Sequence, residues 1–190
     1  MVVRGADTVA VERFVRTGTT MTGELTLSAG IGQRERYHLV VAPDATAPLV
    51  ELSVWRRTDP VQSPARQQTR VIFRDDSVAV DDVTSRGMNT LLFGTTKGAM
   101  PYLNLSFAFL EQAMRRAASL GSDSVSVPFF NLGGGTSGGQ TVTASVRRVG
   151  SDSVALDLGT VEFRLEVDAA GRLLGGGIPA QQIRVIRQPQ

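Results

Sequence analysis

The chain of 190 residues has no cysteine, a single histidine, His38, and a single lysine, Lys97. Without cysteine it has no disulfides, thiolate nucleophiles, cysteine-ligated zinc or iron–sulfur clusters. One histidine does not make a histidine metal cluster, and a catalytic triad would need the fold to bring a serine and a carboxylate to it. The composition therefore favours a protein with no catalytic residues, no metal site and no cofactor.

Long apolar runs are also missing. None approaches the roughly 20 residues that a membrane-spanning helix needs, so no membrane span is expected. Residues 1–6 are too short for a secretory signal, and the first strand is expected to begin directly afterwards, near Thr8. This favours an extracytoplasmic domain, periplasmic or at the cell surface, after removal of an export signal, with a cytoplasmic location as the alternative.

Charge of one sign is scarce as well. The net charge is only +2, and the high pI reflects nineteen arginines against one lysine. Most arginines have an acid nearby, as in Glu12-Arg13 and Glu35-Arg36. A nucleic-acid-binding protein usually gathers its basic residues on one face or in one run. We therefore expect no nucleic-acid partner.

What the sequence does contain is short runs that alternate apolar and polar residues, the period of a strand with one buried face. The first run, 8–16, alternates through Val9, Val11 and Val15. About eleven strands are predicted. The other runs are 21–27, 36–41, 49–56, 69–74, a continuation around 78–80, a weaker run at 87–95, and runs near 125–129, 142–146, 154–158, 161–167 and 183–185.

One stretch changes period. Its apolar residues are spaced by four, three, four and three positions, which places them in one stripe along a helix. Proline suits the first turn of a helix and glycine suits its end, so we predict a helix from about Pro101 to Leu120, capped by Gly121. The residues of the stripe are Leu103, Phe107, Leu110, Met114 and Ala117.

The length suits one domain, residues 1–190, with a sizeable core. Because a flat sheet of about eleven strands twists and curls, the predicted fold is α+β and mostly β. In this fold a strongly curved antiparallel sheet, or an open or closed barrel, wraps the amphipathic helix.

Two glycine-rich stretches and two acidic pairs invite functional interpretations. The stretch 133–139 lacks the lysine of a phosphate-binding loop and precedes a strand, so a hairpin connection is favoured. The stretch 175–177 is expected to form a bend before the last strand. Adjacent acids at 75–76 and 81–82 point to opposite faces of a strand or belong to turns, which argues against a shared catalytic or metal site.

The aromatic residues of the helix leave two interpretations open. Either the stripe belongs to the hydrophobic core, or the helix covers a hydrophobic cavity inside the curved sheet and contacts an acyl chain or another hydrophobic ligand. Phe109 lies off the central stripe and is expected to be partly exposed. The candidate ligand-binding residues are Tyr102, Phe107, Phe109, Leu110, Met114, Trp55 and Phe129.

The order of a long meander, one covering helix and a second meander resembles the bacterial lipoprotein-carrier folds. In these folds an unclosed barrel holds lipid against helices. The order is similar also to uncharacterised periplasmic domains on the same half-barrel plan. The resemblance covers most of the chain and rests on element order, so it implies a fold and a class of ligand but no individual binding residue.

Three functional hypotheses follow. The first is a non-enzymatic extracytoplasmic binding domain for a lipid or another hydrophobic small molecule. The second is a structural or protein-interaction module with a filled core, serving as an accessory domain or subunit. An interior without a cavity of about 300 Å³ or more favours the second. The third, an enzyme whose acids and serines converge only in three dimensions, ranks last because no nucleophile–base pair is visible in the sequence.

Overall fold

The computed structural model describes residues 1–28, 32–132 and 139–188. Its strands are β1 (Val2–Arg4), β2 (Asp7–Arg16), β3 (Thr20–Leu27), β4 (Gln33–Val40), β5 (Leu49–Arg56), β6 (Gln67–Phe73), β7 (Ser77–Thr84), β8 (Gly87–Gly94), β9 (Met100–Tyr102), β10 (Ser124–Asn131), β11 (Thr141–Arg148), β12 (Ser153–Asp157), β13 (Glu162–Val167), β14 (Leu173–Ile178) and β15 (Ile183–Ile186). The helix α1 spans Phe107–Ser119, and a short 3-10 turn, η2, spans Pro179–Gln181.

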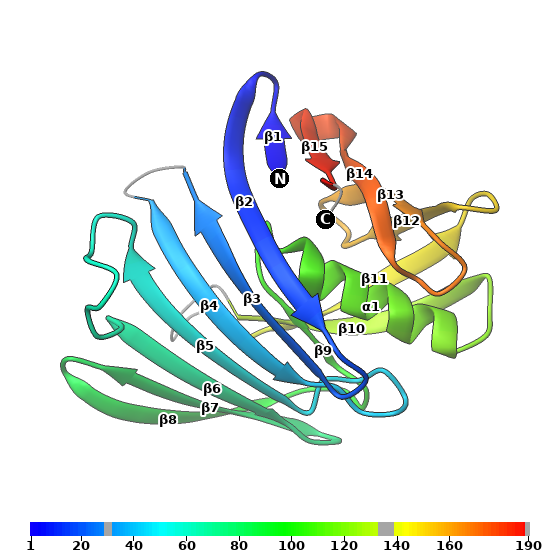
Figure 1. Ribbon diagram of the computed structural model, residues 1–190. Coiled ribbons are helices and arrows are strands. Elements are labelled where there is room, and N and C mark those ends of the chain that lie inside the picture. The colour runs from blue at the N-terminus through cyan, green and yellow to red at the C-terminus, as the bar shows by residue number, and fades with distance from the viewer. Residues whose placement is uncertain (29–31, 133–138, 189–190) are drawn as a thin grey trace.

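These strands form one sheet with the order β8-β7-β6-β5-β4-β3-β2-β1-β15-β14-β13-β12-β11-β10-β9. The sheet curves around α1, and its end strands β8 and β9 do not pair with each other (Figure 1). The predicted curved sheet around one amphipathic helix is confirmed in its unclosed form. The described residues form fifteen strands where about eleven were predicted, because short strands such as β1 and β9 carry too few residues to show an alternation.

The N-terminal and C-terminal halves meet through the two ends of the chain. β1 pairs with β2 on one side and with β15 on the other, so Val2 lies opposite both Ala10 and Val185. Figure 1 shows the two termini near each other beside this junction. A local sequence pattern contains no information on such a pairing, because its partners lie at opposite ends of the chain.

Alternation assigns the faces of most strands correctly. In β4, Glu35, Tyr37 and Leu39 are buried on the concave side, while His38 is on the convex side with Glu51 as neighbour. The adjacent acids of β7 also separate as predicted. Asp81 accepts a hydrogen bond from Thr90 at 2.9 Å, whereas Asp82 accepts from Gln67 and Thr69 at 2.8 Å each.

β2 is the exception, and its faces are the reverse of those predicted. Ala10 is fully buried and Phe14 partly buried, while Val11 and Val15 are exposed, Val15 by 65%. The valines suggested the buried face because valine favours strands on either face of a sheet. The concave face of this strand consequently carries Glu12, a charged residue in the buried phase of the alternation.

The helix is shorter than predicted at its beginning. Ser106 is its N-cap, with its hydroxyl accepting from the amide of Phe109, and Pro101 lies in β9. β9 pairs parallel with β10, so β9, α1 and β10 form a crossover. Proline is compatible with β9 because β9 is an edge strand. The apolar stripe is core as proposed, since all five of its residues are buried.

The glycines at 175–177 lie inside β14 and do not form the predicted bend. A Cβ on Gly176 would lie 2.3 Å from the carbonyl oxygen of Arg164, and one on Gly177 would lie 2.0 Å from that of Ile183. The glycines therefore allow a close approach of backbones at this junction. Of the predicted loop at 133–139, residues 133–138 lie outside the described residues. Among the described helices, none has the length and apolarity to cross a bilayer.

Candidate functional site

A side opening in the sheet wall is the main candidate site. β1 pairs only with the first part of β2, up to Ala10, so no described strand pairs with the stretch 11–16 on that side. The opening lies between this stretch and the strands β14 and β15, and α1 is visible behind it (Figure 1). A cavity of about 880 Å³ fills the opening.

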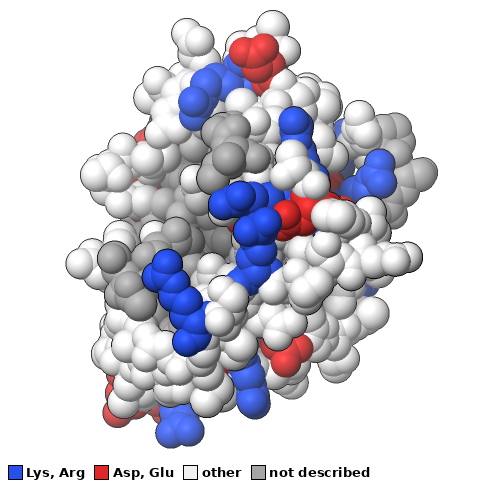
Figure 2. All heavy atoms as spheres, turned by 90° about the vertical axis from the view of Figure 1, so that its left-hand side faces the viewer, with Lys and Arg blue, Asp and Glu red and all other residues white. Residues whose placement is uncertain are grey.

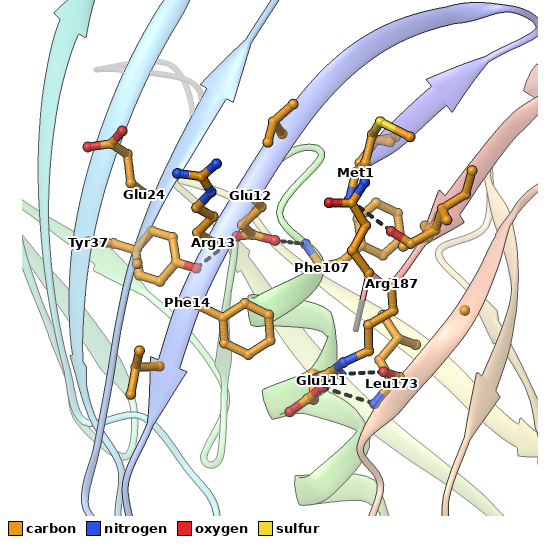
Figure 3. Close-up of a pocket in the computed structure, with 18 of the residues that line it drawn as sticks. Met1, Glu12, Arg13, Phe14, Glu24, Tyr37, Phe107, Glu111, Leu173 and Arg187 are labelled. Carbon is orange, nitrogen blue, oxygen red and sulfur yellow. Dashed lines mark hydrogen bonds and ion pairs between the residues drawn. The ribbon is translucent and has the colours of Figure 1, made fainter. Parts of the chain in front are cut away.

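The cavity has an apolar lining with a few charged groups (Figure 3). Its volume lies in the range of about 300 to 1,000 Å³ that is usual for small-molecule sites. The apolar lining residues include Val2, Val11, Phe14, Val15, Phe107, Leu173, Leu174, Val185 and Ile186. The charged ones are Glu12, Arg13, Glu24, Arg36, Glu111 and Arg187.

Glu12 connects the sheet to the N-terminus of the helix. Its carboxylate accepts hydrogen bonds from the Tyr37 hydroxyl at 2.9 Å and from the backbone amides of Phe107 and Ala108 at 2.8 and 3.1 Å. The Ser106 hydroxyl donates a fourth. These amides belong to the first turn, whose donors have no partner within the helix. Burial raises the pKa of Glu12, and the four hydrogen bonds oppose this effect.

Gly23 makes room for the tyrosine in this cluster. It lies opposite Phe14 on one side and Tyr37 on the other, and a Cβ at this position would lie 2.3 Å from the Tyr37 hydroxyl oxygen. The bare backbone of β3 therefore lets the tyrosine ring pass over it toward Glu12. Burial, reinforced by the charge of Glu12, raises the pKa of Tyr37, so this hydroxyl acts as a hydrogen-bond donor.

A second anchored carboxylate, Glu111, forms the floor of the cavity. It accepts from the Leu173 amide at 3.0 Å, from Arg187 at 2.8 Å and from Arg115 at 3.4 Å. The Arg187 guanidinium also lies over the Phe14 ring, 5.7 Å from its centroid. Arg187 thus crosses the opening between the last strand and β2 (Figure 3).

Both carboxylates have their oxygens engaged by donors. Glu12 holds the first turn of the helix to β2, and Glu111 joins the helix to Leu173 of β14 and to Arg187. The described residues contain no group of three or more His, Cys, Asp or Glu side chains placed to hold a metal ion. The cavity presents mainly apolar side chains, with Arg13 and Arg36 among its charged lining residues.

The arginines at the rim differ in whether they form an ion pair. Arg36 pairs with Glu24 at 2.8 Å, and both side chains are about half exposed. Arg13 is exposed, with no ion pair within the described part of the chain. Elsewhere, short groups of basic side chains alternate with acidic ones and wide uncharged areas on the face turned toward the viewer in Figure 2.

Glu35 lies on the concave side, in the same cross-strand row as Glu12. The row runs Glu12, Leu25, Glu35 and Val54. Glu35 is only 7% exposed, and its Oε2 atom is buried without a hydrogen-bond partner in the described chain. Burial, and to a lesser extent the charge of Glu12, raise the pKa of Glu35 to about 7.

The structure brings one of the seven predicted ligand-binding residues, Phe107, to the cavity. The others lie elsewhere. Phe109, Leu110, Met114 and Phe129 are buried in the core, and Tyr102 packs edge-on against Phe129. The expected partial exposure of Phe109 is wrong, because the sheet encloses the helix on more than the stripe side and Phe109 packs against Tyr37.

Trp55 lies on the convex face, away from the helix. Its ring is flanked by the guanidinium groups of Arg34 and Arg36, at 5.1 and 5.5 Å from the ring centroid, and its indole N–H donates to the carbonyl of Ser63. Trp55 therefore holds the loop that follows β5 against the convex face of the sheet. Trp55 does not line the cavity.

Glu12, Phe14, Glu111 and Arg187 were missed as site residues. For Glu35 a signal was available, since it shares its phase of the alternation with Tyr37 and Leu39. For Glu12 the signal was hidden, because the valines of β2 pointed to the opposite face as the buried one. A carboxylate on the buried phase of a strand is unusual and marks a position with special partners. No comparable signal exists for Arg187, whose partners come from α1 and β14.

Comparison with known proteins bears on the fold. No protein family and no curated protein matches the sequence. A DUF1089 family protein from Pseudomonas aeruginosa has a similar structure, with a TM-score of 0.68 and 13% identity over 96% of this chain and 94% of the other. A beta-barrel-like protein of the domain of unknown function DUF1849 from Brucella abortus has a TM-score of 0.50 and 10% identity, over 92% and 83% of the two chains.

These similarities show the fold alone. At such low identity they transfer no activity, and both descriptions refer to families of unknown function. They support the expected β-rich fold on a barrel-like plan. Neither neighbour is described as a lipoprotein carrier.

Proposed function

We propose that this protein is a non-enzymatic binding domain that accepts a lipid or another hydrophobic small molecule in the side cavity. The observation that carries the proposal is the cavity of about 880 Å³ between β2, α1 and β14–β15. It exceeds the 300 Å³ or so that separates a binding domain from a filled-core module. The resemblance to lipoprotein carriers supports the same class of ligand.

The lining suggests how such a ligand would lie. An apolar chain would contact Phe14, Phe107 and Val185, while the rim presents Arg13 to a polar or anionic end. The inner carboxylates are occupied by helix and backbone donors, which supports binding without catalysis. The extracytoplasmic location expected from the sequence is part of this proposal.

The first test is native mass spectrometry of freshly purified protein, followed by organic extraction of whatever dissociates. We expect a bound lipid at a fixed ratio. After extraction, a dansyl-labelled fatty acid should bind to the protein saturably, with one site per chain. A clean apo mass together with no saturable binding of the probe would overturn the proposal and favour the interaction module.

A cavity variant locates the bound molecule. Phe14→Ser should weaken binding of the dansyl fatty acid about tenfold, since loss of the ring removes apolar contact worth roughly 1.4 kcal/mol or more. The matched control is Val61→Ser, which removes an exposed apolar side chain from the loop after β5, away from the cavity. Equal affinities for the two variants would place the ligand elsewhere.

A further inference from the structure

β8 is an edge strand of the sheet, and its free edge suits pairing with another strand. β8 ends the sheet, and on its outer side no described strand pairs with it. We propose that two copies of this protein form a dimer by antiparallel pairing of their β8 strands, so that one sheet continues through both molecules. This inference goes beyond ligand binding and does not depend on it.

The composition of β8 fits an interface. Exposed edge strands are normally protected from pairing by lysine, proline, a bulge or a very short length. β8 has eight residues, Gly87–Gly94, and contains no charged residue and no proline. Its convex face exposes Met88 by 72% and Leu92 by 71%, next to Val83 of β7 at 40%. The unpaired backbone groups of such a strand can bind another strand, and burial of its apolar side chains in that contact stabilises the pair.

The hydrogen-bonding pattern of the β7–β8 hairpin leaves backbone N–H and C=O groups of β8 free to pair with another strand. Thr84 pairs with Gly87 around a two-residue turn, and in such hairpins the flanking residues form a hydrogen-bonded pair. Every second pair then bonds in the same way. The backbone groups of Met88, Thr90 and Leu92 consequently point away from β7, toward the free edge.

A twofold axis through Thr90 makes this edge self-complementary. Thr90 then forms a hydrogen-bonded pair with Thr90 of the second copy, and Met88 lies opposite Leu92 of the second copy, twice by symmetry. All the free backbone groups between residues 88 and 92 find partners, and the apolar side chains meet on one face. An interface that uses the same patch on both molecules closes as a dimer.

The charges at the two ends of β8 agree with this register. Arg86 is in the turn before β8, and Asp76 lies beside the other end of the strand, where its carbonyl accepts from the Thr95 amide. Neither side chain forms an ion pair within the described residues. An antiparallel arrangement brings Arg86 of each copy toward Asp76 of the other. The occupant that the edge fits is therefore a second copy.

A single cysteine tests the register, because the chain has none of its own. Cα atoms of a hydrogen-bonded antiparallel pair are about 5.5 Å apart, within the range of about 4.4 to 6.8 Å that a disulfide bridges. Thr90→Cys should give a covalent dimer under mild oxidation, several-fold faster than the control Val61→Cys, which places a thiol at a loop position 71% exposed. Equal rates for the two variants would overturn the proposed pairing.

The mass of the protein in solution provides the second measurement. Light scattering after gel filtration should give twice the chain mass of 20.3 kDa for the unmodified protein at micromolar concentration. Leu92→Lys, which places a cation opposite Met88 of the second copy, should give the mass of one chain with an unchanged circular dichroism spectrum. A monomeric unmodified protein, or a dimer that persists in Leu92→Lys, would contradict the proposal.

Discussion

Glu12→Leu is expected to lower the free energy of unfolding by about 3 to 5 kcal/mol, enough to unfold a marginal domain. The substitution leaves four donors without their acceptor: the hydroxyls of Tyr37 and Ser106 and the amides of Phe107 and Ala108. Each buried donor without a partner costs about 1 to 3 kcal/mol, and removal of a desolvated carboxylate recovers part of the sum.

Urea unfolding followed by circular dichroism measures this loss. The matched control is Glu24→Gln on the neighbouring strand, whose carboxylate pairs with Arg36 in solvent. An exposed ion pair contributes about 1 kcal/mol or less, so the control should stay close to the unmodified protein. If Glu12→Leu were as stable as this control, the carboxylate would not be what holds the helix in the sheet.

The second large effect is a dependence of stability on pH caused by Glu35. Its pKa is raised from 4.5 to about 7 in the folded protein, so between these pH values the folded state binds more protons than the unfolded state. Stability is therefore highest below about pH 4.5 for this group and decreases as the pH rises through 7. A shift of this size corresponds to a loss on the order of 3 kcal/mol.

Glu35→Gln should remove most of this slope, because glutamine carries no charge at any pH. Midpoints of urea unfolding measured from pH 4.5 to pH 8 should decrease strongly for the unmodified protein and much less for the variant. Glu162→Gln, which changes an exposed carboxylate paired with Arg164, serves as the control and should keep the slope. If the variant and the unmodified protein had parallel pH profiles, Glu35 would titrate normally.

Glu12 contributes to the pH profile in the same direction. Burial raises its pKa too, so its ionisation also destabilises the fold as the pH rises. The two carboxylates lie in one cross-strand row with only Leu25 between them, and the charge of Glu12 raises the pKa of Glu35. Some slope should therefore remain in Glu35→Gln, and its residual size measures the contribution of Glu12.

Local periodicity explains which sequence predictions hold. The alternation in β4 placed Tyr37 and Leu39 inside and His38 outside, and the spacing of Phe107, Leu110 and Met114 identified the buried stripe of α1. Both patterns follow from the geometry of a single element. Composition failed where it was ambiguous, as in β2, where Val11 and Val15 lie outside, and at Pro101, which suits an edge strand as well as a first helical turn.

The site depended on contacts between distant parts of the chain. Glu12 meets the amide of Phe107 across 95 positions of sequence, and Arg187 meets Glu111 across 76. The side opening exists because β1 is short and β15 pairs beside it, and neither strand has enough residues for a periodic signal.

The sequence by itself thus determined a curved antiparallel sheet around one amphipathic helix, because the period and spacing of side chains are properties of each segment alone. Only the tertiary structure decided where the sheet wall opens, which groups the buried carboxylates contact and which strand keeps a free edge. Those features are set by which segments become neighbours, and pairing over long distances in the chain leaves no local trace in the sequence.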